Sequence, residues 1–335
     1  MNGESRAANG RTALIWSERY RLAALTREEW QGVAVAAGIV AFLFVLFHYL
    51  GNTVADVNSR SAFRWTLARW SDRVAFGDAD YSHGWLIPMV SIFVVWHRRK
   101  AIMSAPKQVS NWGLAVIVGA LLMHWVGAKM QQTRLSLLSL ILLLWGFPFY
   151  FYGWGVARQL VFPAAYLVFA IPLNFLEFVS GKLQVLTSVI SSGVLNGLGI
   201  AVKRDGVRLF SESGFSFEVA GACSGLRSLL AMTALTAVYA FFTQRGLVRQ
   251  WLLFLCSIPL AVAGNIARIT TIGLVAEAFG ERLALGIYHD YSGYIVFAVG
   301  ILLMVGIGSL IALDYRAVRQ RWREQWSPSH AVRPA

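Results

Sequence analysis

The chain has 335 residues, of which 57% are hydrophobic and only 14% are charged. Soluble domains carry about a quarter charged residues, so this composition excludes an ordinary soluble enzyme as well as a disordered or collagen-like chain. The net charge of +13 would suit a nucleic-acid-binding protein, but no basic stripe interleaved with stacking aromatics occurs, so no nucleic-acid partner is expected. Long apolar runs recur instead from Trp30 to Leu313, which predicts an all-α polytopic membrane protein.

A helix needs about 20 apolar residues to cross a bilayer, and about eight segments approach this length. The predicted spans cover about 31–50, 81–97, 112–128, 135–153, 159–178, 224–242, 248–270 and 288–313. Prolines and glycines interrupt the fourth and fifth spans, at Pro148, Gly153, Gly155 and Pro163. We expect three parts in the chain: a cytoplasmic N-terminal segment (1–30), one transmembrane domain (31–313) and a basic cytoplasmic tail (314–335).

Basic residues between the spans predict the orientation, because cytoplasmic loops are enriched in Lys and Arg. The N-terminal segment, residues 97–100, the turn that holds Arg245 and Arg249, and the C-terminal tail are all basic. About eight spans place these four clusters on one side, so both termini are expected in the cytoplasm. The polar, arginine-containing start of the chain predicts no cleavable signal peptide.

The longest outer segment is predicted at 179–223. Residues 183–200 are apolar with interspersed Ser, Asn and Gly, so we expect an interfacial or re-entrant helix there. Two short alternating runs, 206–210 and 215–219, flank a glycine-containing turn, which predicts a β-hairpin on the outer face. The hairpin leads directly to Cys223.

Three polar residues fall at the outer ends of consecutive predicted spans. Cys223 lies among small residues at a helix start, where the helix N-terminus and Arg227, four residues later on the same face, favour the reactive thiolate. Arg268 lies about 27–30 Å along its span from the basic inner end. His289 begins the next span and can exchange a proton near neutral pH.

Each residue also has a structural explanation: a packed small side chain, an arginine that reaches lipid headgroups, and an interfacial histidine. Together, a thiol, a guanidinium and an imidazole on one face are the minimum for acyl transfer through a thioester. Cys256 lies mid-span without a charged neighbour, so we expect it to pack. Two cysteines make neither a disulfide framework nor a metal cluster, and the sequence predicts no metal site and no cofactor.

The motifs around these residues resemble the signature of the exosortases. They are Phe215–Leu229, Pro259–Ile269, Tyr288–Gly293 followed by Phe297, and the upstream Tyr81–Pro88. The resemblance covers about Tyr81 to Leu313 and implies a bacterial inner-membrane cysteine enzyme with its active site facing the periplasm. It implies a catalytic set of Cys223, Arg268 and His289; archaeosortases have arginine at the third place, so the histidine favours the bacterial branch. Further candidates for lining the site are Ser224, Arg227, Asn265 and His83.

The resemblance also implies a substrate class. Exosortases are expected to act as proteases or transpeptidases on exported proteins with a C-terminal PEP-CTERM signal, which combines a Pro-Glu-Pro-like motif, a transmembrane helix and a basic tail. The implied partners are this sorting-signal helix, the lipid bilayer and a glycolipid or polysaccharide acceptor, since family members accompany exopolysaccharide gene clusters.

Two other function classes stay open: a polysaccharide-associated membrane transporter and a non-catalytic assembly factor. The absence of a visible inverted repeat, and the near absence of acidic residues within the spans, argue against transport. An assembly factor would tolerate substitution of all three site residues. A metalloprotease is disfavoured because the sequence has no His-Glu-x-x-His motif.

Overall fold

The computed structural model describes residues 27–51, 60–71, 81–172, 175–212, 214–218 and 226–313. This part of the chain is mostly helical, and six of its helices are long and apolar enough to cross a membrane. They cover Trp30–Tyr49, Asn111–Lys129, Thr133–Ala170, Phe178–Gly197, Leu247–Phe279 and Tyr291–Ala312. The prediction of a polytopic helical membrane protein is therefore confirmed. The expected segments 1–30 and 314–335 lie almost entirely outside the described residues.

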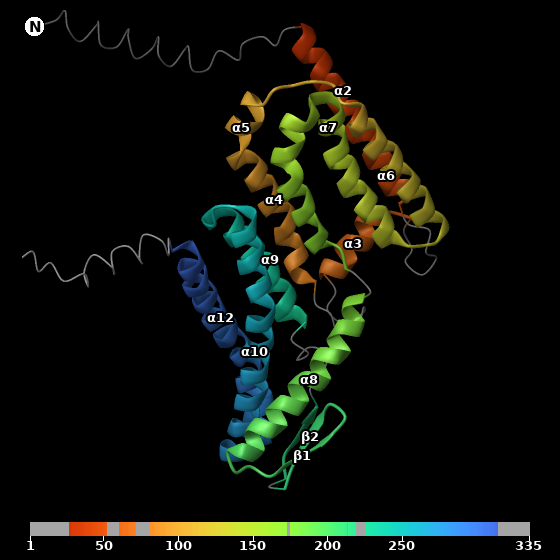
Figure 1. The fold of residues 1–335 in the computed structure, drawn as a ribbon. Coiled ribbons are helices and arrows are strands. Elements are labelled where there is room, and N and C mark those ends of the chain that lie inside the picture. The colour runs from red at the N-terminus through yellow and green to blue at the C-terminus, as the bar shows by residue number, and fades with distance from the viewer. Residues whose placement is uncertain are drawn as a thin grey trace, which may run out of the picture.

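The N-terminal half forms one helical group, at the top of Figure 1. Its elements are α2 (Arg27–Tyr49), α3 (Ala62–Ser71), η1 (Ser82–Trp85), α4 (Leu86–His97), α5 (Arg99–Ser104), α6 (Asn111–Lys129), α7 (Thr133–Tyr166) and η2 (Leu167–Ala170). Leu43 and Phe47 of α2 pack with Ile117 of α6 and Leu137 of α7 in the core of this group.

Helix α7 reverses direction at Gly153. This residue has a φ of 75°, which favours glycine, and a Cβ there would overlap the carbonyl oxygen of Gln108. The Trp145 indole N–H donates to the Ala157 carbonyl oxygen at 2.9 Å, although 12 residues of straight helix would separate the two by about 18 Å. The break coincides with the predicted end of span 135–153. The second arm ends at Tyr166, earlier than the predicted residue 178.

The C-terminal half forms a second group, which carries a small sheet at the bottom of Figure 1. Its elements are α8 (Phe175–Gly197), β1 (Val202–Asp205), β2 (Arg208–Ser211), β3 (Ser216–Glu218), α9 (Leu226–Thr243), α10 (Leu247–Phe279), α11 (Glu281–Leu283), the π-helical turn η4 (Ala284–Tyr288) and α12 (His289–Ala312). Helix α10 packs against α8, α9 and α12, so it is the central element of this group.

The sheet has the antiparallel order β1-β2-β3. The pair β2–β3 confirms the predicted hairpin. Strand β1, which the sequence analysis missed, joins β2 through a turn at Gly206, where φ is 60°. Phe215 and Phe217 bury one face of the sheet against Ile269 and Ile272 of α10.

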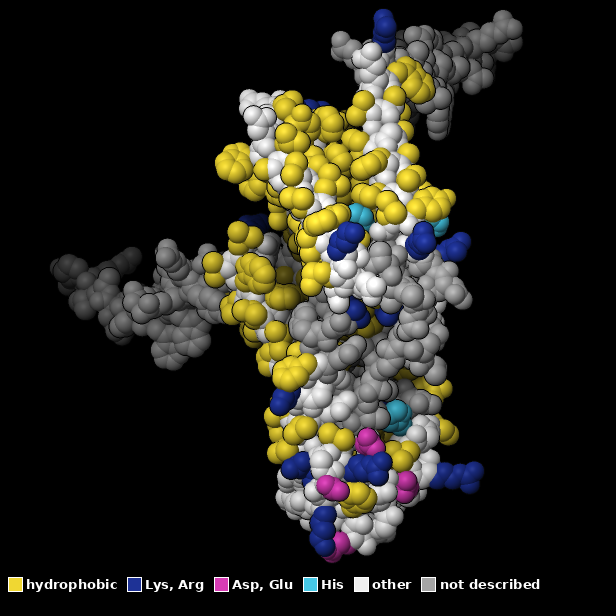
Figure 2. Space-filling view, turned by 90° about the vertical axis from the view of Figure 1, so that its right-hand side faces the viewer, with side chains coloured by type: hydrophobic (Ala, Val, Ile, Leu, Met, Phe, Trp, Pro, Cys, Tyr) yellow, Lys and Arg dark blue, Asp and Glu magenta, His cyan; other side chains and the backbone are white. Residues whose placement is uncertain are grey.

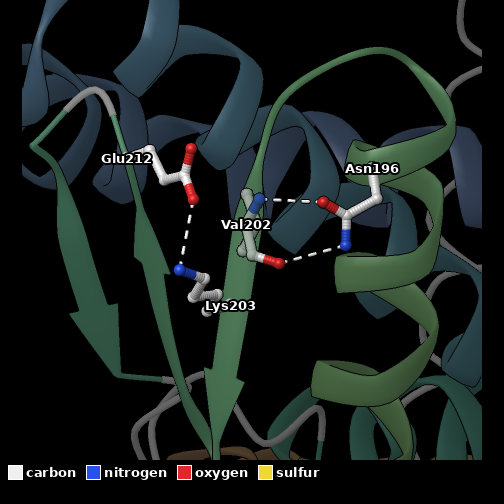
Figure 3. A network of polar contacts seen from close by, with 4 residues as sticks. All are labelled: Asn196, Val202, Lys203 and Glu212. Atoms are coloured by element: carbon white, nitrogen blue, oxygen red, sulfur yellow. Dashed lines mark hydrogen bonds and ion pairs between the residues drawn. The ribbon is translucent and has the colours of Figure 1, made fainter.

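The end of α8 is fixed to β1 by one amide side chain (Figure 3). Asn196 Nδ2 donates to the Val202 carbonyl oxygen at 3.0 Å, and the Val202 N–H donates to Asn196 Oδ1 at 2.8 Å. These bonds occupy the outer edge of β1. An exposed ion pair, Lys203 Nζ to Glu212 Oε1 at 3.2 Å, lies beside them.

Helix α8 differs from the expected interfacial helix at 183–200. It begins eight residues earlier, at Phe175, and by length and composition alone it could cross a membrane. Thr187 and Ser191 on its buried face bond to α10: Asn265 Nδ2 donates to Thr187 Oγ1 at 3.2 Å, and Ser191 Oγ donates to the Ile266 carbonyl oxygen at 3.3 Å. The small polar residues in this segment thus serve helix packing.

Two of the basic clusters lie at the same end of the bundle. The Arg98 guanidinium lies 4.6 Å from the centre of the Phe241 ring, at the end of α9. Arg249 Nη1, at the start of α10, donates to the Ala312 carbonyl oxygen at 3.5 Å. The sheet lies at the opposite end of α10 (Figure 1), where charged side chains of both signs gather on the surface (Figure 2). The basic turn at the start of α10 and the mixed-charge sheet therefore lie at opposite ends of this helix.

Candidate active site

Arg268 projects from α10 onto the first turn of α12. Its Nη2 donates to the His289 carbonyl oxygen at 3.1 Å, and its Nε donates to Ser292 Oγ at 3.2 Å. The guanidinium packs against Gly293, where a Cβ would stand 3.6 Å from Arg268 Cζ. The sequence-predicted pair Arg268 and His289 is therefore brought together, through the histidine's backbone.

Ser292 connects the two predicted residues. An arginine N–H can only donate, so the Ser292 oxygen accepts from Arg268 while its own proton is directed to the His289 carbonyl oxygen, at 3.1 Å. The serine is buried, with 2% of its surface exposed. A guanidinium has five N–H donors. The two bonds above leave three of them without a partner among the described residues. The site can therefore still bind an anionic oxygen.

The backbone before His289 departs from a regular helix. Residues 284–288 form the π-helical turn η4, in which Gly286 has non-helical angles (φ −91°, ψ −112°). Ala284 is fully buried against Ile269 and Ile272 of α10. Such π-turns occur frequently at functional sites. Here the turn places His289 at the first position of α12, next to Arg268.

Asn265 has a packing role in the described contacts. It is 4% exposed and its amide bonds to Thr187 on α8, one turn from Arg268 on the same helix. This contact holds α8 beside the turn of α10 that carries the arginine, and the expected role of Asn265 in lining the site stays a prediction.

The predicted nucleophile lies outside the described residues, as does Ser224; the side chain of Arg227 is also outside them. Chain connectivity still relates Cys223 to the structure. It precedes Leu226, the first residue of α9, by three positions and follows Glu218, the last residue of β3, by five. Helix α9 packs against both α10 and α12, which carry the other two predicted residues.

The upstream motif lies beside the start of α9. Tyr81 packs with Leu226, Leu230 and Trp70 in one apolar cluster. The ring of His83 lies 6.0 Å from the ring of Tyr81. The structure therefore brings the motif that contains His83 next to the first turns of α9, which begins three residues after Cys223, although the two are about 140 positions apart in sequence.

The second cysteine, Cys256, is a half-buried free thiol within α10, more than two turns from Asn265. Ser292 is the site residue that the sequence analysis missed. A signal for it exists: it lies three positions after His289 on the same helix face, within a motif already singled out. Among the described residues, no group of three or more His, Cys, Asp or Glu side chains could hold a metal ion.

Comparison with known proteins identifies the chain through one family model. No curated protein and no solved structure gives a significant match to the chain. The family model described as transmembrane exosortase (Exosortase_EpsH) matches residues 70–306. This match spans more than half of the chain, including η1, the sheet, α9, α10 and the start of α12. The chain belongs to the transmembrane exosortase family.

Proposed function

We propose that the protein is a membrane-embedded cysteine peptidase or transpeptidase that cleaves the C-terminal sorting signal of PEP-CTERM-type exported proteins. Cys223 acts as the nucleophile, Arg268 stabilises the oxyanion and His289 transfers the proton. The observation that carries the proposal is the fixed guanidinium of Arg268 on the first turn of α12, with N–H donors left for a substrate oxygen. Preorganised donors of this kind supply much of the rate enhancement in acyl transfer.

Chain reach supports the role of Cys223. Three extended residues span at most about 11 Å, so the Cα of Cys223 lies within that distance of the Cα of Leu226. Leu226 is buried at the end of α9 that packs with Tyr81. Because α9 packs against both α10 and α12, this reach supports Cys223 as the nucleophile that acts with Arg268 and His289.

In the reaction, the Cys223 thiolate attacks the carbonyl carbon of the scissile peptide bond. Arg268 stabilises the negative charge that develops on the carbonyl oxygen. The tetrahedral intermediate collapses, the C–N bond breaks, and His289 protonates the leaving amine. A thioester remains on Cys223. An amine or hydroxyl of a glycolipid or polysaccharide acceptor then attacks the thioester in a transpeptidation. His289 takes the acceptor's proton and the sulfur leaves as the thiolate, which restores the starting state; with water as the acceptor, the result is hydrolysis.

Among the described residues, no strand pairs with the second edge of β3, which suits an extended substrate segment. The Ser211 N–H donates to the Phe215 carbonyl oxygen at 2.9 Å, and bonded positions alternate along an antiparallel pair. By this alternation the backbone groups of Ser216 and Glu218 point away from β2. The opposite edge of the sheet is occupied at Val202 by Asn196. A peptide added to β3 would run beside the chain that leads to Cys223.

The test compares Cys223→Ala with the matched control Cys256→Ala, using a reporter that carries the sorting signal. We expect Cys223→Ala to accumulate in the membrane and leave the reporter uncleaved, while Cys256→Ala processes it normally. Mass spectrometry of the reporter's new C-terminus gives the cleavage position and any attached group. Normal processing by Cys223→Ala would refute the nucleophile. Loss of polysaccharide export without any cleaved reporter would favour the transporter.

We further propose that the protein resides in a bacterial inner membrane with both termini in the cytoplasm and the sheet in the periplasm. The opposed positions of the basic turn and the mixed-charge sheet support this orientation. A membrane-impermeant thiol reagent applied to intact spheroplasts should label Cys223 and leave Cys256 unlabelled. Labelling of Cys223 only after the membrane is opened would reverse the orientation.

A further inference from the structure

An apolar cavity of about 310 Å³ lies between α3, α4 and α7, away from the candidate active site. Four elements line it: Phe63, Thr66, Leu67 and Trp70 of α3, Pro88 of α4, Leu137, Leu140, Ile141 and Leu144 of α7, and Leu167, Ala170 and Ile171 around η2. Its volume is at the lower end of the roughly 300–1,000 Å³ that is common for ligand sites.

The lining offers no polar group to a ligand. Its hydroxyl, on Thr66, donates to the Ala62 carbonyl oxygen at 2.8 Å within α3. Its indole N–H, on Trp70, donates to the Ala170 carbonyl oxygen at 2.9 Å. A cavity whose polar atoms are already bonded within the protein favours hydrocarbon over water or a polar ligand.

One end of the cavity is cationic. Arg134 lies one turn before Leu137 on α7, and its Nε donates to the carbonyl oxygen of Pro172, the residue after Ile171. The Arg134 guanidinium lies 5.3 Å from the centre of the Trp65 ring, and that of Arg69 lies 3.7 Å from the same ring. Two permanent charges are thus fixed beside the end of a hydrocarbon-lined space. Figure 2 shows Lys and Arg side chains at the height of α3.

The cavity and its cationic end together have the length of one leaflet. Ten residues of α7 separate Arg134 from Leu144, which corresponds to about 15 Å along the helix, or half of the roughly 30 Å hydrocarbon core. Leu67 and Leu144 line the cavity and are 39% and 46% exposed, so it opens sideways at these side chains. In a membrane protein that opening faces lipid.

We propose that this cavity binds one hydrocarbon chain of an anionic membrane lipid, whose phosphate lies against Arg69 and Arg134. Basic residues beside an apolar slot provide charge complementarity for such a lipid. A transmembrane helix is too large an occupant, because a cylinder 10 Å wide and 15 Å long fills about 1,200 Å³. The inference is independent of the proposed reaction. The bound lipid chain would be separated from the start of α9 by the side chain of Trp70, which also packs with Tyr81 and Leu226.

Native mass spectrometry of the purified protein, titrated with phosphatidylglycerol or with phosphatidylcholine, tests the proposal. We expect phosphatidylglycerol to be retained at least tenfold better. Leu140→Trp fills the cavity and should abolish this retention. The control Leu142→Trp places the same side chain on an exposed position of α7 that does not line the cavity, so it should leave the retention unchanged. Arg134→Gln should retain both lipids equally. Equal retention of both lipids by the wild-type protein, or unchanged retention by Leu140→Trp, would refute the proposal.

A second measurement needs no variant. Phosphatidylglycerol that carries a photoreactive diazirine in its acyl chain is crosslinked to the wild-type protein, and the adducts are mapped by peptide mass spectrometry. We expect adducts within 63–70 and 137–144, which an excess of phosphatidylcholine does not suppress. Adducts spread evenly over the lipid-facing helices would show nonselective solvation by the bilayer and would overturn the inference.

Discussion

Replacing Ser292 by alanine tests whether the first turn of α12 positions Arg268, the residue that we propose stabilises the oxyanion. The change removes the acceptor of the Arg268 Nε–H bond and leaves the Nη2 bond to the His289 carbonyl oxygen in place. A hydrogen bond to a charged group contributes about 1.5–3 kcal/mol. Because one of the two anchors remains, we expect the lower half of this range, which corresponds to a roughly 13–45-fold fall in kcat. KM should stay unchanged, because the oxyanion forms in the transition state and is absent from the bound substrate.

The assay follows cleavage of a sorting-signal peptide by purified enzyme in vesicles, so that kcat and KM are obtained separately. Ser292→Thr keeps the hydroxyl and should restore most of the rate. Ser309→Ala is the matched control: this exposed serine of α12 bonds only to the Val305 carbonyl oxygen one turn earlier, and its loss should leave kcat unchanged. The positioning role of Ser292 is refuted if Ser292→Ala keeps the wild-type kcat, or if its loss of activity comes entirely from a higher KM.

The remaining predictions concern stability, measured as the thermal unfolding midpoint in detergent. Gly153→Ala should lower the free energy of unfolding by at least about 2 kcal/mol, because its φ is 75° and the new methyl group overlaps the Gln108 carbonyl oxygen. In the control Gly119→Ala, the new Cβ has no atom within 4 Å, so the free energy of unfolding should not fall in this way. Asn196→Ala should lower the free energy of unfolding by about 1–3 kcal/mol, because it removes two hydrogen bonds to β1. An added protease should then cut the sheet faster, and an unchanged rate of this proteolysis would contradict the prediction. Lys203→Ala breaks an exposed ion pair and should stay within about 0.5 kcal/mol of wild type.

The parts of the fold that the sequence predicted correctly depend on local signals. The apolar lengths of α2, α6 and α12 each approach one bilayer thickness, and the β2–β3 hairpin follows from alternation around a glycine turn. The meeting of Arg268 with the start of α12 was predicted by counting residues from the basic inner end of one span and from the position of His289 at the outer start of the next. Counting works here because helix rise is constant, so residue number converts directly to depth.

The features that were missed depend on contacts between distant segments. Strand β1 has few apolar residues; it is stabilised by pairing with β2 and by Asn196 rather than by its own pattern. Ser292 looks like any polar residue near a helix start until Arg268 is placed opposite it. The sequence also showed no sign that Thr187 and Ser191 of α8 bond across to α10, because periodicity cannot identify the partner of a buried face.

The length of α10 connects these features to the proposed chemistry. The helix has 33 residues, or about 50 Å, which exceeds the roughly 30 Å hydrocarbon core. Arg268 lies 21 residues from its basic start, about 32 Å along the axis, so the permanent charge reaches the level where hydrocarbon ends and its burial cost falls. The last 11 residues, about 16 Å, extend further and carry Ile269 and Ile272 beneath the sheet. One overlong helix therefore sets the depth of the arginine that we propose to bind the oxyanion and supports the strand edge beside it. Under the proposed function, this is the level of a peptide bond just outside the membrane span of the substrate.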